Sequence, residues 1–246
     1  MIRLLAFREL RSLFSTPSTW FMLAALQFIF SWFFLSRLDA FLQVQTQLAL
    51  IANAPGAAQT IVAPLFDTLG LVMMMLVPVL TMRVLAEERR NQTMPLLMAA
   101  PVSSAQIVLG KFIGLMLFLL LPIVVSTLLV LVLKLGTPLD TGLLLSNAAG
   151  LLLLTASYAA LGLYISALTI QPIVAAIGAL AALVGLWLVN SSAGDGSIWH
   201  VLAPTGHFRH FNTGLLDSSD LVYYLLFCAF FLLLAMRRVH NNRIYG

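Results

Sequence analysis

The sequence predicts an all-α polytopic membrane protein, in which six transmembrane helices form a single domain over residues 1–246. Of the 246 residues, 61% are apolar and only 9% are charged, whereas roughly 25% of the residues of an ordinary soluble domain are charged. The apolar runs are dominated by Leu and Ala without period-two alternation, which excludes a membrane barrel. The net charge of +4 comes without a basic stripe, and the one cysteine cannot form an internal disulfide. A nucleic-acid-binding domain and a disulfide-stapled secreted fold are therefore excluded.

Six apolar runs approach the length of about 20 residues that a helix needs to cross a bilayer. The Lys and Arg residues are distributed unevenly around them: three precede the first run, four lie between the second and third, and three follow the sixth. Only three lie on the opposite side. Because positively charged loops stay in the cytoplasm, we expect both termini to be cytoplasmic. The runs are residues 19–35, 65–82, 113–133, 143–165, 172–190 and 221–236.

The segment ahead of the first run has an amphipathic pattern. On a helical wheel of residues 2–14, apolar side chains gather opposite Arg8, Arg11 and Ser12. A helix with an arginine-rich polar face is typical of the membrane interface, so we expect residues 1–18 to form an interfacial helix. The alternative is a basic tail that only fixes the orientation of the first span. The apolar side chains are Ala6, Phe7, Leu10, Leu13 and Phe14.

The sequence contains no energy source of its own. Proton-coupled transport needs carboxylates or histidines inside the membrane, and the interiors of spans three to six contain no Asp, Glu, Lys, Arg or His. A phosphate-binding loop is excluded because Phe112 follows Gly110-Lys111 and Ala105 stands where the first glycine is required. An intramembrane hydrolase would need a base beside Ser157 or Ser166, and the sequence places none there. We therefore expect no catalytic residue, cofactor or metal in this chain, and mechanical coupling to a separate cytoplasmic engine.

Residues 83–112, between the second and third spans, have the features of a contact segment for that engine. Thr93 can cap a two-turn apolar helix, which Pro101 would close. Ser103 and Gln106 have the spacing of a capping box, so the third spanning helix is expected to begin in the cytoplasm. The short helix would then face the cytosol, although an interfacial helix lying on lipid fits the same pattern. Its apolar side chains are Leu96, Leu97 and Met98.

Two groups of motifs resemble a known family. The group around the end of the second span closely resembles the permease subunit of ABC-2 type exporters, and the later group is similar to the gliding-motility-associated subgroup of these permeases. The first group is Thr81-Met82-Arg83, Ala86-Glu87-Glu88-Arg89-Arg90, Leu96-Leu97, Pro101-Val102 and Ile107-Val108-Leu109-Gly110-Lys111-Phe112. The second is Ser166-Ala167-Leu168-Thr169, Gln171, Ile173-Val174-Ala175-Ala176, His207-Phe208, Phe211, Gly214, Leu216-Asp217 and Asp220-Leu221-Val222-Tyr223.

The resemblance implies a connecting helix before the first span, a coupling helix between spans two and three, and a dimeric permease of the bacterial inner membrane. Two cytoplasmic ATPase subunits would drive it and would bind the ATP and Mg²⁺. A second membrane subunit with a large extracytoplasmic domain commonly accompanies the subgroup. The sequence departs from the family pattern at Gln92 and Pro95, where Gly and Glu are usual. The implied ATPase-coupling residues are Glu87, Glu88, Arg89, Arg90, Thr93, Met94, Leu96, Leu97 and Met98.

An alternative function is a non-transporting complex that passes ATP-driven motion to an extracytoplasmic partner. The sequence does not separate this alternative from export, because no continuous polar substrate path can be assigned. It also leaves open the substrate, and whether the dimer pairs two copies of this chain or two related subunits.

Residues 191–220 combine five Gly and Pro residues with apolar ones, which predicts an extracytoplasmic or re-entrant segment. His207 and His210 stand about one helical turn apart. One interpretation is that they bind a metal ion together with His200 and Asp217. We favour anchoring at the membrane interface, where histidines and aromatic residues commonly lie.

Packing features are also expected within the spans. The run Met73-Met74-Met75 could bind copper or line a substrate path, but methionine usually fills core space, which we predict here. Residues 169–171 should form a tight turn between spans four and five. Small residues along the fourth span favour close approach of helices, and they are Gly150, Ala156, Ser157, Ala159, Ala160 and Gly162.

Overall fold

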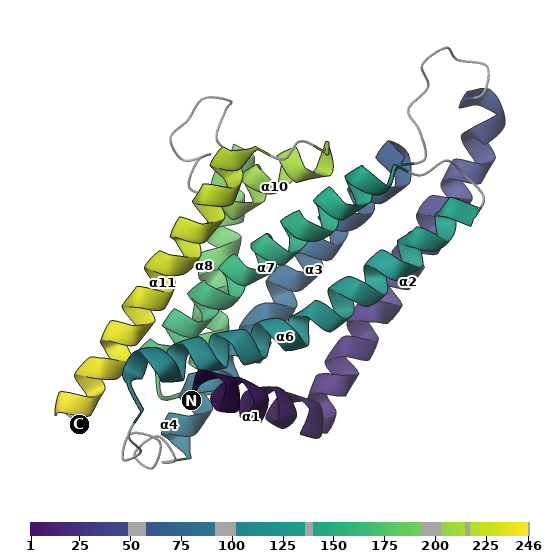
Figure 1. Ribbon diagram of the computed structural model, residues 1–246. Helices are drawn as coiled ribbons and strands as arrows, with labels where there is room; N and C mark the ends of the chain where they lie inside the picture. The colour runs from purple at the N-terminus through teal and green to yellow at the C-terminus, as the bar shows by residue number, and fades with distance from the viewer. Residues whose placement is uncertain (49–57, 92–101, 136–139, 193–202, 215–216, 246) are drawn as a thin grey trace.

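The computed structural model describes residues 1–48, 58–91, 102–135, 140–192, 203–214 and 217–245, and all regular structure within them is helical (Figure 1). The α-helices are α1 (Ile2–Ser15), α2 (Pro17–Leu48), α3 (Ala63–Met82), α4 (Glu88–Arg90), α6 (Ser104–Leu131), α7 (Thr141–Leu168), α8 (Pro172–Ser192), α10 (Pro204–Asn212) and α11 (Ser218–Tyr245). Two π-helical turns, η1 (Ala58–Val62) and η2 (Arg83–Glu87), flank α3, and a 3₁₀ turn, η3 (Val132–Leu135), follows α6.

Six helical segments are long and apolar enough to cross a membrane, which confirms the predicted all-α polytopic fold. They are Pro17–Gln43, Thr60–Arg90, Ser104–Lys134, Thr141–Leu168, Pro172–Ser191 and Ser218–Asn241. Each contains one of the predicted apolar runs and extends past it, because the helices continue into polar residues at their ends. Figure 1 places both chain termini, α1 and α4 at one end of the bundle, here called the terminal end, and α10 at the other, here called the α10 end.

Helix α7 is the centre of the bundle. It packs against α3, α6, α8, α10 and α11, and small residues let these neighbours approach closely. A Cβ added at Gly150 would lie 2.6 Å from Cβ of Phe211 on α10, and one added at Gly162 would collide with Thr81 on α3. The predicted close packing of the fourth span is therefore confirmed. The predicted tight turn is also confirmed, since α7 ends at Leu168 and α8 begins at Pro172.

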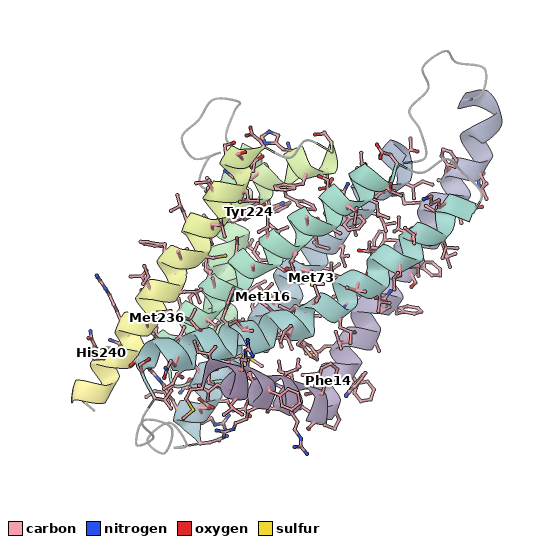
Figure 2. All side chains as sticks on the ribbon, in the orientation of Figure 1. Phe14, Met73, Met116, Tyr224, Met236 and His240 are labelled. Atoms are coloured by element: carbon pink, nitrogen blue, oxygen red, sulfur yellow. The ribbon has the colours of Figure 1, made fainter. Side chains whose placement is uncertain are left out.

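Helix α2 lies at the edge of the bundle, beside α3 and α6 (Figure 1). Its sharp corner with α1 is fixed by side chains that satisfy the last carbonyl groups of α1. The Thr19 hydroxyl donates to the Leu13 carbonyl, and Trp20 Nε1 donates to the Phe14 carbonyl at 2.7 Å. The Phe14 ring lies edge-on to Phe118 of α6 at this corner (Figure 2). The corner thus joins α1 rigidly to the first span.

The methionine run lies on α3 at the middle of the bundle. Met73 and Met74 are buried in the main apolar core, and Met75 is exposed on the outside of the helix (Figure 2). The predicted core packing is confirmed for Met73 and Met74 and is wrong for Met75, because its side chain points away from the core. The described residues contain no group of three or more His, Cys, Asp or Glu side chains suited to hold a metal ion.

Candidate functional site

Helix α1 docks on α6 at the terminal end through a pair of glycines one turn apart. A Cβ added at Gly114 would lie 2.7 Å from the Ala6 carbonyl oxygen, and one added at Gly110 would lie 2.7 Å from Cβ of Leu5. Only glycine leaves room for the backbone of α1 at these two positions. The predicted N-terminal helix therefore exists, and one of its faces is covered by the third spanning helix.

A buried ion-pair cluster lies between these two glycines. Lys111 on α6 is only 4% exposed, and its Nζ lies 2.9 Å from Glu9 Oε2 of α1 and 2.9 Å from Glu88 Oε1 of α4. The two carboxylates are themselves mostly buried, 15% and 22% exposed. A buried lysine is tolerated only when its charge is compensated. The cluster therefore depends on α1, α4 and α6 being in place together.

The segment that carries Glu88 continues the second span. Helix α3, the π-turn η2 and α4 follow one another without a break from Ala63 to Arg90. A π-turn shifts the backbone hydrogen-bond register and leaves amides that need other partners. The Ser166 hydroxyl of α7 accepts from Ala86 N at 3.0 Å and from Leu85 N at 3.3 Å. The π-turn is thus locked to the central helix, which gives Ser166 a structural role.

The start of α6 is fixed by reciprocal hydrogen bonds between Ser103 and Gln106. Ser103 Oγ accepts from Gln106 N at 3.2 Å, and Gln106 Oε1 accepts from Ser103 N at 3.1 Å. This confirms the predicted capping box. Residues 92–101, between α4 and this cap, lie outside the described residues. The coupling segment is therefore bounded by two helices that Lys111 ties together.

A family model described as an ABC-2 family transporter protein matches residues 4–238. The chain belongs to the ABC-2 transporter family. The match covers both α1 and the Lys111 cluster, and members of the family act as membrane components of transporters. No curated protein matches the chain.

The structure places four of the predicted coupling residues of this ABC-2 protein at the terminal end. Glu88 is held by Lys111, Arg89 is half-buried, and Glu87 and Arg90 are exposed. The other predicted coupling residues, Thr93, Met94, Leu96, Leu97 and Met98, lie outside the described residues.

Arg83 does not form the helical pair with Glu87 that its spacing allows. Its Nη1 donates instead to Ser18 Oγ at the start of α2, at 2.7 Å, and none of the ion pairs among the described residues joins it to Glu87. Arg83 therefore links α2 to the terminal end of the second span, and the Glu87 side chain faces outward.

Two residues of the Lys111 cluster, Glu9 and Lys111, are not among the predicted coupling residues. The sequence identifies Lys111 as a cytoplasmic charge within a family motif, without indicating an ion pair, and it does not distinguish Glu9. A signal was present, since Gly110 and Gly114 form a GxxxG pattern, which marks a helix that another backbone approaches closely. The pattern does not say which helix approaches, so the partner carboxylate could not be named from it.

At the α10 end, the metal alternative is not supported among the described residues. His207 and His210 both turn Nδ1 toward Asp220 of α11, at 2.5 and 2.8 Å from its two oxygens. Asp217, the carboxylate expected nearby, instead accepts from Ser219 N at 3.1 Å. His200 lies outside the described residues. The two histidines therefore anchor α10 to α11 through a buried carboxylate.

Proposed function

We propose that this ABC-2 protein is the permease subunit of an ATP-driven exporter, and that a separate cytoplasmic ATPase docks on residues 83–112. The Lys111 cluster carries the proposal. It joins α4 and α6, the helices on both sides of residues 92–101, to each other and to α1. A displacement imposed on the segment would therefore reach the second span, the third span and the N-terminal helix together.

The orientation follows from the uneven distribution of Lys and Arg, which puts both termini and the terminal end in the cytoplasm. Helix α1 would then lie at the cytoplasmic interface of a bacterial inner membrane. The ATP and Mg²⁺ would be bound by the partner ATPase. The similarity to the gliding-motility-associated subgroup supports a further partner, either a second permease copy or a related membrane subunit. The extracytoplasmic domain of that related subunit would face the α10 end.

The docking surface is tested with the double variant Leu96→Ala, Leu97→Ala. Removing two apolar side chains that are buried in a partner costs about 2–5 kcal/mol together, or roughly thirtyfold or more in affinity. We expect a matching loss of the ATPase that copurifies with the permease in mild detergent. The matched control is Leu225→Ala, Leu226→Ala, which removes two exposed leucines of α11. Equal amounts of ATPase with both double variants would contradict the docking proposal.

The exposed Glu87 side chain separates docking from internal structure. Because the Glu87 side chain is exposed and forms no ion pair with the described residues, Glu87→Gln should change the free energy of unfolding by less than about 0.5 kcal/mol. We expect it to lower ATPase activity in the assembled complex by removing a charge at the partner surface. Full activity of this variant would show that the acid is only a solvated charge.

A further inference from the structure

A small cavity lies at the α10 end, where α3, α8 and α10 meet. Its volume is about 180 Å³. That is far more than one water needs, and less than the roughly 300–1,000 Å³ of a pocket for a drug-sized ligand. The cavity therefore has the size for a small molecule or the headgroup of a lipid. Its polar side chains are Asp67, Asn190, Thr205 and Arg209, and its aromatic ones are Trp187 and Phe208.

Three oxygen atoms that line the cavity have no hydrogen-bond partner among the described residues. Asn190 is 8% exposed, and its Oδ1, like Thr205 Oγ1, is buried without a hydrogen bond to the described residues. Asp67 accepts from Asn212 Nδ2 at 2.5 Å through Oδ1 only, and its second oxygen has no hydrogen bond within the described part of the chain. Buried polar atoms without partners are costly, so the oxygens of Asn190 and Thr205 favour a ligand that brings hydrogen-bond donors, and the exposed carboxylate of Asp67 lies open beside them.

The charges of the cavity are separated. Arg209 stands on the wall contributed by α10, close enough for its charge to act on Asp67. None of the ion pairs among the described residues joins these two side chains. The cavity therefore offers a carboxylate and a guanidinium group to one ligand, instead of pairing them with each other.

We propose that the cavity binds a small zwitterion that carries a primary ammonium group. The three N–H donors of such a group match the three free oxygens of Asp67, Asn190 and Thr205. The anionic part of the ligand, a phosphate or a carboxylate, would lie toward Arg209. This site goes beyond the proposed coupling to an ATPase, and ligand binding here does not require the ATPase to be present.

The experiment uses the full chain in nanodiscs of phosphatidylglycerol, titrated with O-phosphoethanolamine by calorimetry. We expect saturable binding, which Asp67→Asn should weaken about tenfold or more. Phosphocholine should bind at least tenfold more weakly, because its ammonium group has no N–H donor. The matched control is Asp39→Asn, which removes the charge of an exposed carboxylate on α2. Thermal unfolding of each variant checks that the bundle is intact.

A second arm distinguishes a lipid headgroup from a free solute. After delipidation in detergent, the retained phosphatidylethanolamine and phosphatidylglycerol are measured for the wild type and for Asp67→Asn. Selective retention of phosphatidylethanolamine that depends on Asp67 would identify the headgroup as the ligand, and soluble binding without such retention would identify a free zwitterion. No saturable binding together with no Asp67-dependent retention would overturn the proposal and leave a cavity that holds only water. Equal binding of phosphocholine would overturn the assignment of a primary ammonium group.

Discussion

The two ends of the bundle hold a short helix in electrostatically opposite ways. At the terminal end, a buried cation, Lys111, binds the carboxylates of Glu9 and Glu88. At the α10 end, a buried anion, Asp220, binds the imidazoles of His207 and His210. The first cluster joins residues up to 102 positions apart in the chain, whereas the second joins residues at most 13 positions apart.

This difference separates two mechanical roles. The Lys111 cluster connects helices that the chain itself does not hold together, so a force on one is felt by the others. Helix α10 would stay close to α11 in any case, and its contact with the rest of the bundle comes from packing and hydrogen bonds, without an ion pair among the described residues. Phe211 packs on Gly150 of α7, and the Ser146 hydroxyl of α7 donates to the Phe211 carbonyl at 3.0 Å. Ion pairs therefore join the helices at the terminal end, whereas packing and hydrogen bonds join α10 to α3 and α7 at the α10 end.

The largest expected effect comes from Lys111→Met, which leaves two carboxylates buried without their cation. Breaking a buried pair in this way costs about 3–5 kcal/mol. We expect a strong loss of thermal stability of the purified protein, measured by unfolding in detergent. The change should also expose α1 to proteolysis, because its Glu9 contact is lost.

The matched control for this variant is Lys134→Met, at the other end of the same spanning segment, where the lysine side chain is exposed. It removes the same charge and adds the same side chain without touching an ion pair among the described residues. If both variants unfold at the wild-type temperature, the Lys111 cluster does not connect the helices.

A smaller effect is expected from Asp220→Asn at the α10 end. The asparagine keeps the shape of the side chain but loses the charge that the two imidazoles share, and a disrupted buried hydrogen bond costs about 1–3 kcal/mol. The packing of Phe211 on Gly150 remains, so α10 should stay in place. Thermal unfolding should thus show a clearly smaller loss than for Lys111→Met. A loss as large as that of Lys111→Met would show that charge, not packing, holds this end.

The sequence was sufficient for the features that depend on neighbouring residues. Long apolar runs gave the six spans, and the spacing of Ser103 and Gln106 gave the start of α6. The Lys111 cluster could not be predicted, because Glu9 lies 102 positions away and only the docking of α1 brings it close. The spacing of His207 and His210 places them about one helical turn apart, but it does not identify the carboxylate that they contact. The expected carboxylate, Asp217, is wrong. Asp217 caps a helix, and it is Asp220, within the first turn of α11, that points inward.

The smallest expected effect concerns that cap. Asp217 immediately precedes α11, and the hydrogen bond from Ser219 N holds the pKa of its carboxyl below the ordinary value. A lowered pKa in the folded state means that the cap stabilises the protein above the unfolded pKa of about 3.9, and that this contribution is lost as the pH falls through the folded value. The unfolding temperature of Asp217→Ala should therefore lie slightly below that of the wild type at pH 7, and the gap should close below about pH 4. A gap that stays unchanged as the pH falls from 5 to 3 would show that the side chain acts through something other than its charge.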